Sequence, residues 1–258
     1  MPIRAERLNR RVHWREGGSR LSVRFEELAW AETRMGPISL RRRLDPVVNV
    51  DVYEIKLDDE FLMSSLFTVA EVELARLALA AQHAPVLDVV VGGLGLGYTA
   101  CGALDEPRVR SVTVVEAIDE VINWHRQGLL PFAARLTTDQ RSTLVHGDFF
   151  AMVAGRGFDP DAPGRRAHVI MVDIDHSPRH VLHPDHAWFY TDDGLRHLTR
   201  HLHPGGVFAL WSNDPPDEEF MATAGRVFAA CRAHVVTFRN PLHGAASANT
   251  VYVATRSA

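Results

Sequence analysis

Hydrophobic and polar positions follow two different patterns along this chain, and the change falls near residue 82. Before it, between Leu21 and Ser64, apolar residues tend to alternate with polar ones, as in strands with one buried face. The strand-like runs are 21–25, 38–40 and 50–55. They predict a small antiparallel β segment, and the alanine- and leucine-rich stretch 69–81 predicts a helix that joins it to the rest of the chain.

Beyond Pro85, short apolar runs rich in β-branched residues alternate with helical patterns. The predicted strands lie near 86–91, 111–116, 142–145, 168–173, 206–211, 233–238 and 250–254. This alternation predicts an α/β fold, with a mostly parallel seven-stranded sheet and helices on both faces. We therefore expect three parts: a basic arm (1–20), a small β-rich domain with its linking helix (21–82) and a Rossmann-like domain (83–258).

Composition and charge narrow the classes of function. A net charge of -4 argues against binding of nucleic acid. Cys101 and Cys231 stand far apart with no C-x-x-C motif, which favours a reduced, cytoplasmic location. No apolar run approaches a membrane span and no secretory signal is visible, so we expect no membrane contact. The arginine-rich arm is expected to be disordered, with subunit contact in a homodimer as the alternative.

The most informative segment follows the first predicted strand of the larger domain. Four glycines occur within six positions there, and a helical pattern comes next; they are Gly92, Gly93, Gly95 and Gly97. Glycine lets the backbone approach a ligand closely, and the N-terminus of the following helix leaves N–H groups free. Glu116 ends the next apolar run about 20 residues further on, where a carboxylate can accept both ribose hydroxyls. This combination predicts a nucleoside or nucleotide site.

The spacing of the glycines distinguishes between nucleosides. A dinucleotide fingerprint needs a third small residue where Tyr98 stands, and no phosphate-binding P-loop motif is present. The G-x-G-x-G spacing is instead typical of S-adenosylmethionine enzymes. Asp148 follows the third predicted strand and can accept a hydrogen bond from an adenine amino group, with Phe149 flanking the ring. The alternative interpretation of Asp148 is the N-cap of a short helix.

Candidate catalytic residues follow the fourth predicted strand. Ligands of open parallel sheets lie beyond the carboxyl ends of the strands, so Asp173 should stand beside the group to be transferred. A carboxylate there can orient an acceptor amine or take its proton. Asp175 is a second candidate acid, and His176 could act as a base near neutral pH. The alternative is that the two aspartates only cap the following turn.

Two further patterns carry less weight. The segment 213–216, Asn-Asp-Pro-Pro, is similar to a motif of amino-group methyltransferases, but it follows the fifth strand and Asp217 replaces the expected aromatic. A loop with a helix start is the favoured interpretation. His197 and His201 lie one helical turn apart without other ligands at metal-binding spacing, so we expect a solvated helix face and no metal.

Residues 86–256 resemble the spermidine synthase-like branch of the class I S-adenosylmethionine-dependent methyltransferase fold. The segments that carry the resemblance are the glycine turn, Glu116, Gly147-Asp148, the strand end at Asp173, Phe189-Tyr190 and 202–207. The β-rich segment before them, with 57–60, also resembles the N-terminal sheet of aminopropyltransferases. The resemblance implies that Glu116 binds the ribose, Asp148 the adenine and Asp173 the acceptor amine. It also implies S-adenosylmethionine, or its decarboxylated form, as donor.

The chain departs from the aminopropyltransferase pattern at three places. Gly95 occupies the position of an aspartate that meets the donor's amino group in G-G-G-D-G, and Tyr-His-Glu is reduced to Glu71 alone. The D-[ST]-[ST]-D-P signature is reduced to the aspartates at 173 and 175, the second one step early. A desolvated ammonium without a carboxylate partner costs several kcal/mol. We therefore expect an enzyme that moves an alkyl group, methyl slightly ahead of aminopropyl, to a small nucleophile such as an amine. The alternatives are a true polyamine aminopropyltransferase, a non-catalytic adenosyl-binding protein and a dinucleotide oxidoreductase.

Overall fold

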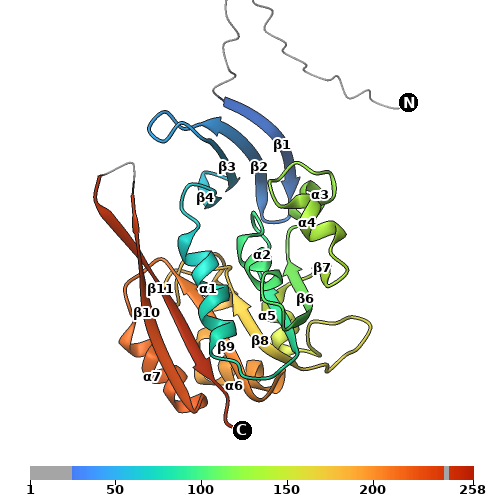
Figure 1. Cartoon of the computed structure of the whole chain (residues 1–258), viewed down its shortest axis with the longest axis vertical. Coiled ribbons are helices and arrows are strands. Elements are labelled where there is room, and N and C mark those ends of the chain that lie inside the picture. The colour runs from blue at the N-terminus through green and yellow to red at the C-terminus, as the bar shows by residue number, and fades with distance from the viewer. Residues whose placement is uncertain (1–24, 241–243) are drawn as a thin grey trace, which may run out of the picture.

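The computed structural model describes residues 25–240 and 244–258, which form two sheets (Figure 1). The smaller sheet is antiparallel, with its four strands in sequence order: β1 (Phe25–Thr33), β2 (Gly36–Leu44), β3 (Asp51–Leu57) and β4 (Glu60–Ser64). The predicted runs 38–40 and 50–55 lie in β2 and β3, whereas β4 and nearly all of β1 were not predicted. The predicted basic arm (1–20) and the start of the predicted strand at Leu21 lie outside the described residues.

The larger sheet has seven strands, and each one overlaps a predicted strand. They are β5 (Leu87–Gly92), β6 (Val109–Glu116), β7 (Ser142–His146), β8 (Ala167–Val172), β9 (Leu202–Ser212), β10 (Ala230–Arg239) and β11 (Ala246–Thr255). Their order is β10-β11-β9-β8-β5-β6-β7, and β11 alone runs in the direction opposite to the other six strands. The predicted α/β fold, a mostly parallel sheet with a small N-terminal antiparallel segment, is therefore confirmed.

Helices cover both faces of the larger sheet. One face carries α1 (Val69–Ala80), α2 (Tyr98–Leu104), α3 (Asp119–Arg126) and α4 (Ala133–Thr138). The other carries α5 (Phe149–Ala154), the 3-10 helix η1 (Pro184–Tyr190), α6 (Asp192–Arg200) and α7 (Glu218–Val227). Helix α1 matches the predicted linking helix and runs from the small sheet along the large one (Figure 1). Across the described ranges, no helix combines the length and apolar character needed to span a membrane.

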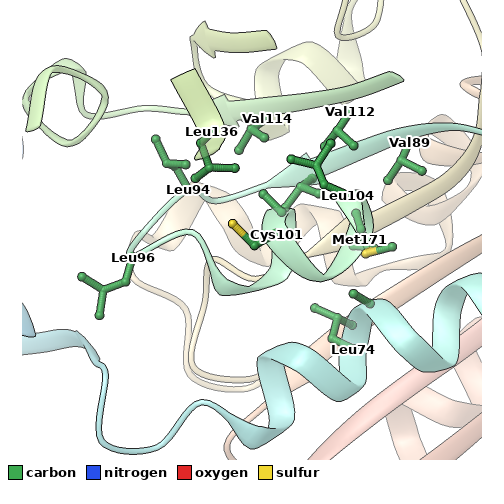
Figure 2. Close-up of a cluster of buried hydrophobic side chains, with 14 of the residues drawn as sticks. Leu74, Val89, Leu94, Leu96, Cys101, Leu104, Val112, Val114, Leu136 and Met171 are labelled. Carbon is green, nitrogen blue, oxygen red and sulfur yellow. The ribbon is translucent and has the colours of Figure 1, made fainter. Parts of the chain in front are cut away.

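Alternation along the buried strands divides the interior into two hydrophobic cores. In β5, Val89 and Val91 belong to one core and Val90 to the other, because successive side chains point to opposite faces. Figure 2 shows the first core, in which α2 lies between α1 and the sheet and Leu94 of the glycine turn lies beside Leu136 of α4. Leu94 and Leu96 of that turn are buried in it. Hydrophobic packing thus fixes the turn in place next to the small sheet.

Candidate active site

A cavity of about 640 Å³ lies between the small sheet and the carboxyl ends of the parallel strands. Its size is that of a small-molecule site. The predicted site residues that line it are Gly93, Gly95, Glu116, Asp148, Phe149, Asp173 and His176. Three others, Gly92, Gly97 and Asp175, are not part of the lining. The fold therefore brings most of the predicted residues to one place.

Gly93 is held so tightly that no other residue fits. Its φ is +92°, and a Cβ there would lie 2.2 Å from the backbone carbonyl oxygen of Asp173. On the far side of the turn, the ring Nε2 of His125 is 2.9 Å from the carbonyl oxygen of Gly95. Burial lowers the pKa of His125, so this ring is neutral near pH 7. The glycine turn is thus preformed.

Glu116 reaches the glycine turn from the end of β6. Its Oε2 accepts a hydrogen bond from the Leu94 backbone N–H at 3.0 Å, and Oε1 accepts from the Ile118 N–H at 2.9 Å. Burial raises the pKa of Glu116, while these backbone donors oppose the rise. Each carboxylate oxygen has a second lone pair, so Glu116 can still accept the hydroxyls of a ribose.

Met63 fills the space where a side chain at position 95 would stand. Gly95 has a φ of +45°, and a Cβ there would lie 2.8 Å from the Met63 sulfur. The same sulfur is 3.2 Å from the backbone nitrogen of Leu96, which donates to it. The sequence indicated that an acid is missing at this position. It did not indicate that a thioether from β4 replaces it, because that contact joins two different sheets.

Asp148 caps helix α5 and also lines the cavity. Its Oδ1 accepts hydrogen bonds from the backbone N–H groups of Phe150 (2.8 Å) and Ala151 (3.1 Å), so the N-cap interpretation is confirmed. Its Oδ2 forms no hydrogen bond within the described part of the chain. Phe149 is mostly buried and stacks on Phe158, with 5.0 Å between ring centroids. Adenine recognition by Asp148 and Phe149 remains a prediction.

Two carboxyl groups meet at the floor of the cavity. Asp173 follows β8, and its Oδ2 accepts a 2.7 Å hydrogen bond from the Thr99 hydroxyl. Glu71 comes from α1 and is only 7% exposed. Neither forms an ion pair within the described residues, although both line the cavity. Burial raises the pKa of Glu71 to about 8, and the charge of Asp173 contributes to this rise. Burial also raises the pKa of Asp173, to about 6. Near neutral pH this pair therefore holds about one proton.

Asp175, the second candidate acid, is not part of the cavity lining. It is 2% exposed, and its Oδ1 accepts from the backbone N–H of Leu182 (2.7 Å) and lies 2.8 Å from Nδ1 of His186. Its Oδ2 accepts from the Tyr190 hydroxyl at 2.8 Å. The strand has ended at Val172 and the chain turns, so the carboxylate points into the loop. Asp175 orders the loop that follows β8.

His186 is a cavity residue that the sequence did not single out. Its ring packs on Phe150, with 4.1 Å between centroids, and Asp175 holds its Nδ1. In the sequence, His186 is one of several histidines in the segment 176–203, and no local pattern distinguishes it from the others. His197 and His201 instead contact separate backbone carbonyls. Among residues 25–240 and 244–258, no group of three or more ligating side chains is arranged to hold a metal ion.

His176 and Phe61 lie where the small sheet meets the loop that follows β8. Nε2 of His176 is 2.8 Å from Oε1 of Glu60, at the start of β4. Phe61 lines the cavity yet is 55% exposed, which places it at the rim. The ammonium of Lys56 stands 4.9 Å from the centroid of the Phe61 ring. These contacts join the rim of the cavity to both sheets.

Comparisons with known proteins agree with this geometry. No protein-family model matches the chain, and no curated protein does either. Among solved structures, the spermidine synthase from Thermotoga maritima superposes with a TM-score of 0.66 and 17% identity, over 90% of this chain and 72% of that one. A spermidine synthase in complex with the transition-state analogue AdoDATO superposes with a TM-score of 0.68 and 16% identity, over 90% of this chain and 74% of that one. Human methyltransferase-like protein 13 in complex with SAH superposes with a TM-score of 0.54 and 19% identity, over 72% of this chain and 82% of that one. These similarities confirm the spermidine synthase-like methyltransferase fold.

Proposed function

We propose that this chain binds an adenosyl sulfonium donor and catalyses transfer of an alkyl group to a small nucleophile. The observation that carries the proposal is a single cavity with two functional ends. One end has the glycine turn and Glu116, and the other has the Glu71–Asp173 carboxyl pair. Two structures that share the fold contain ligands of this kind, SAH in one and AdoDATO in the other.

Each residue near the donor has a role that its contacts support. Glu116 accepts the ribose hydroxyls, and Gly93 lets the glycine turn pack closely against the backbone of Asp173. Asp148 offers its free Oδ2 to the adenine amino group. S-adenosylmethionine or its decarboxylated form would supply an electrophilic carbon bonded to a positively charged sulfur. Asp173, supported by the Thr99 hydroxyl, orients the nucleophile and receives its proton.

Methyl transfer is placed slightly ahead of aminopropyl transfer. With Met63 packed against Gly95, no carboxylate stands at that position to attract the donor's amino group. The carboxylated donor also meets no negative charge there that would repel it. Aminopropyl transfer is the second candidate, because the two spermidine synthase alignments cover 90% of the chain and so extend into the small sheet. The alignment with methyltransferase-like protein 13 covers only 72% of this chain.

Calorimetry with four ligands in parallel tests the proposal: S-adenosylmethionine, its decarboxylated form, methylthioadenosine and NAD. We expect the adenosyl ligands to bind, the carboxylated donor at least as well as the decarboxylated one. A hundredfold preference for the decarboxylated donor would instead favour spermidine synthesis. Selective NAD binding would favour an oxidoreductase. Tight adenosyl binding without turnover on any acceptor would leave a non-catalytic binding protein.

A further inference from the structure

The acceptor half of the cavity is lined mainly by apolar side chains of the small sheet and its surroundings. They are Ile55, Leu57, Phe61, Leu62, Phe67 and Trp211. Met35, in the turn between β1 and β2, is also part of the lining and is 39% exposed. An exposed apolar rim that continues into an apolar wall is the surface that a hydrocarbon or aromatic group prefers.

Against this wall stands one concentrated source of negative charge. Glu71 is almost fully buried and close enough to Asp173 for the Asp173 charge to act on it, and neither carboxyl has a cationic partner within the described residues. A buried carboxyl pair that holds about one proton can stabilise one ammonium, or one amine that loses its proton to the pair. These two residues therefore mark the place of a single nitrogen.

A second buried carboxylate, which a diamine would need at its other end, does not line the acceptor half. Asp175 is turned into the loop and bonded to Tyr190 and His186. His176 is the residue that reaches the cavity wall instead. Two other acids lie nearby, and water screens the charge of both. Asp185 has a side chain that is 91% exposed and lies 3.6 Å from His183. The side chain of Glu60 is 56% exposed and lies 2.8 Å from His176.

On the basis of the proposed function, we infer that the acceptor is a monoamine with an apolar body. Its nitrogen lies at Glu71 and Asp173, and its hydrocarbon or aromatic part lies against Leu57, Phe67 and Trp211 of the cavity wall. A diamine such as 1,4-diaminobutane is disfavoured, because its second ammonium would lose water against apolar side chains without a carboxylate partner.

Calorimetry of four amines with the full chain tests this inference, each with and without saturating methylthioadenosine. The amines are butylamine, hexylamine, 2-phenylethylamine and 1,4-diaminobutane. Each buried methylene should tighten binding about fourfold, so hexylamine should bind about 15-fold more tightly than butylamine. 2-Phenylethylamine should also exceed butylamine. 1,4-Diaminobutane should bind at least about tenfold more weakly than butylamine, which differs from it by one amine only.

Variants separate the two parts of the inference. Asp173→Asn removes the charge that the pair carries near neutral pH and should weaken all four amines about tenfold or more. Glu73→Gln, on helix α1 and paired with Arg76, should leave them unchanged. His176→Asp places a carboxylate on the wall and should improve 1,4-diaminobutane relative to butylamine.

The opposite results would overturn the inference. They are tighter binding of the diamine than of hexylamine, or no binding of any amine. The proposed function fails separately: if methylthioadenosine does not bind while the amines keep the expected order without it, the acceptor site stands and the adenosyl donor does not.

Discussion

Neutralising Glu71 should make the protein more stable in alkaline solution. The pKa of this carboxyl rises from 4.5 to about 8 on folding, chiefly because burial disfavours its charged form. Below about pH 4.5 both the folded and the unfolded chain carry the proton, so Glu71 has no effect on the pH dependence. Between pH 4.5 and 8 the unfolded chain loses the proton while the folded chain keeps it, and stability falls as the pH rises.

The size of this loss follows from the two pKa values. A rise from 4.5 to about 8 corresponds to at most about 5 kcal/mol, at about 1.4 kcal/mol for each pH unit. Glu71 lines a cavity that water enters, and buried sites behave as if their effective dielectric constant were about 20. We therefore expect Glu71→Gln to increase the free energy of unfolding at pH 8 by about 1–3 kcal/mol. For a chain of this length that raises Tm by about 2–10 °C.

Urea and thermal unfolding of the wild type and Glu71→Gln at pH 5 and pH 8 measure this effect. The difference between the two proteins should be small at pH 5 and large at pH 8. Glu73→Gln is the matched control on helix α1, because Glu73 is paired with Arg76 and the arginine lowers its pKa. That change should cost about 0–1 kcal/mol. If the Glu71→Gln variant is less stable than the wild type by the same amount at pH 5 and pH 8, the carboxyl pair is not arranged as described.

Three other experiments test the site. Glu116→Ala removes the ribose contact and should weaken methylthioadenosine about ten- to a hundredfold by calorimetry; unchanged affinity would remove Glu116 from the site. Asp173→Asn should keep nucleoside affinity and lower turnover about 10²- to 10⁴-fold on an identified acceptor, whereas Asp175→Asn should chiefly lower Tm, because the carboxylate binds the loop after β8. Gly95→Asp should be destabilised by the clash with the Met63 sulfur, and Met63→Ala in the same chain should recover folding and shift preference to the decarboxylated donor; equal folding of both would contradict the contact.

Local patterns predicted the larger sheet because its central strands, such as β5 and β8, are buried on both faces. Runs such as the one in β5 consist of β-branched and apolar residues, and no other element accounts for them. Strand β1 was missed for the opposite reason. It carries Glu26 and Glu27, which are uncommon in strands, and they face Arg42 and Arg41 of β2 at 2.7 and 3.8 Å. Such pairs exist only once the hairpin has formed.

In the candidate site too, residues placed by local pattern were predicted and residues placed by long-range packing were not. Glu116 and Asp173 were predicted because each ends a parallel strand, and strand ends gather at one edge of a sheet. Glu71 has the local pattern of an ordinary helical acid, since its burial comes from packing of α1 against α2 and the large sheet. The direction of Asp175 could not be predicted, because alternation stops where the strand ends.

Lys56 is the only lysine in the chain, and it stands over the Phe61 ring at the rim of the cavity. Within this sequence, Lys56 is therefore the only side chain that an amine-directed fluorophore modifies, and a terminal α-amine is the competing site. The α-amine has the lower pKa, so blocking it first near pH 7 leaves Lys56 as a unique attachment point. The fluorescence of a dye on Lys56 can therefore report ligand entry at the rim of the cavity, without an engineered cysteine.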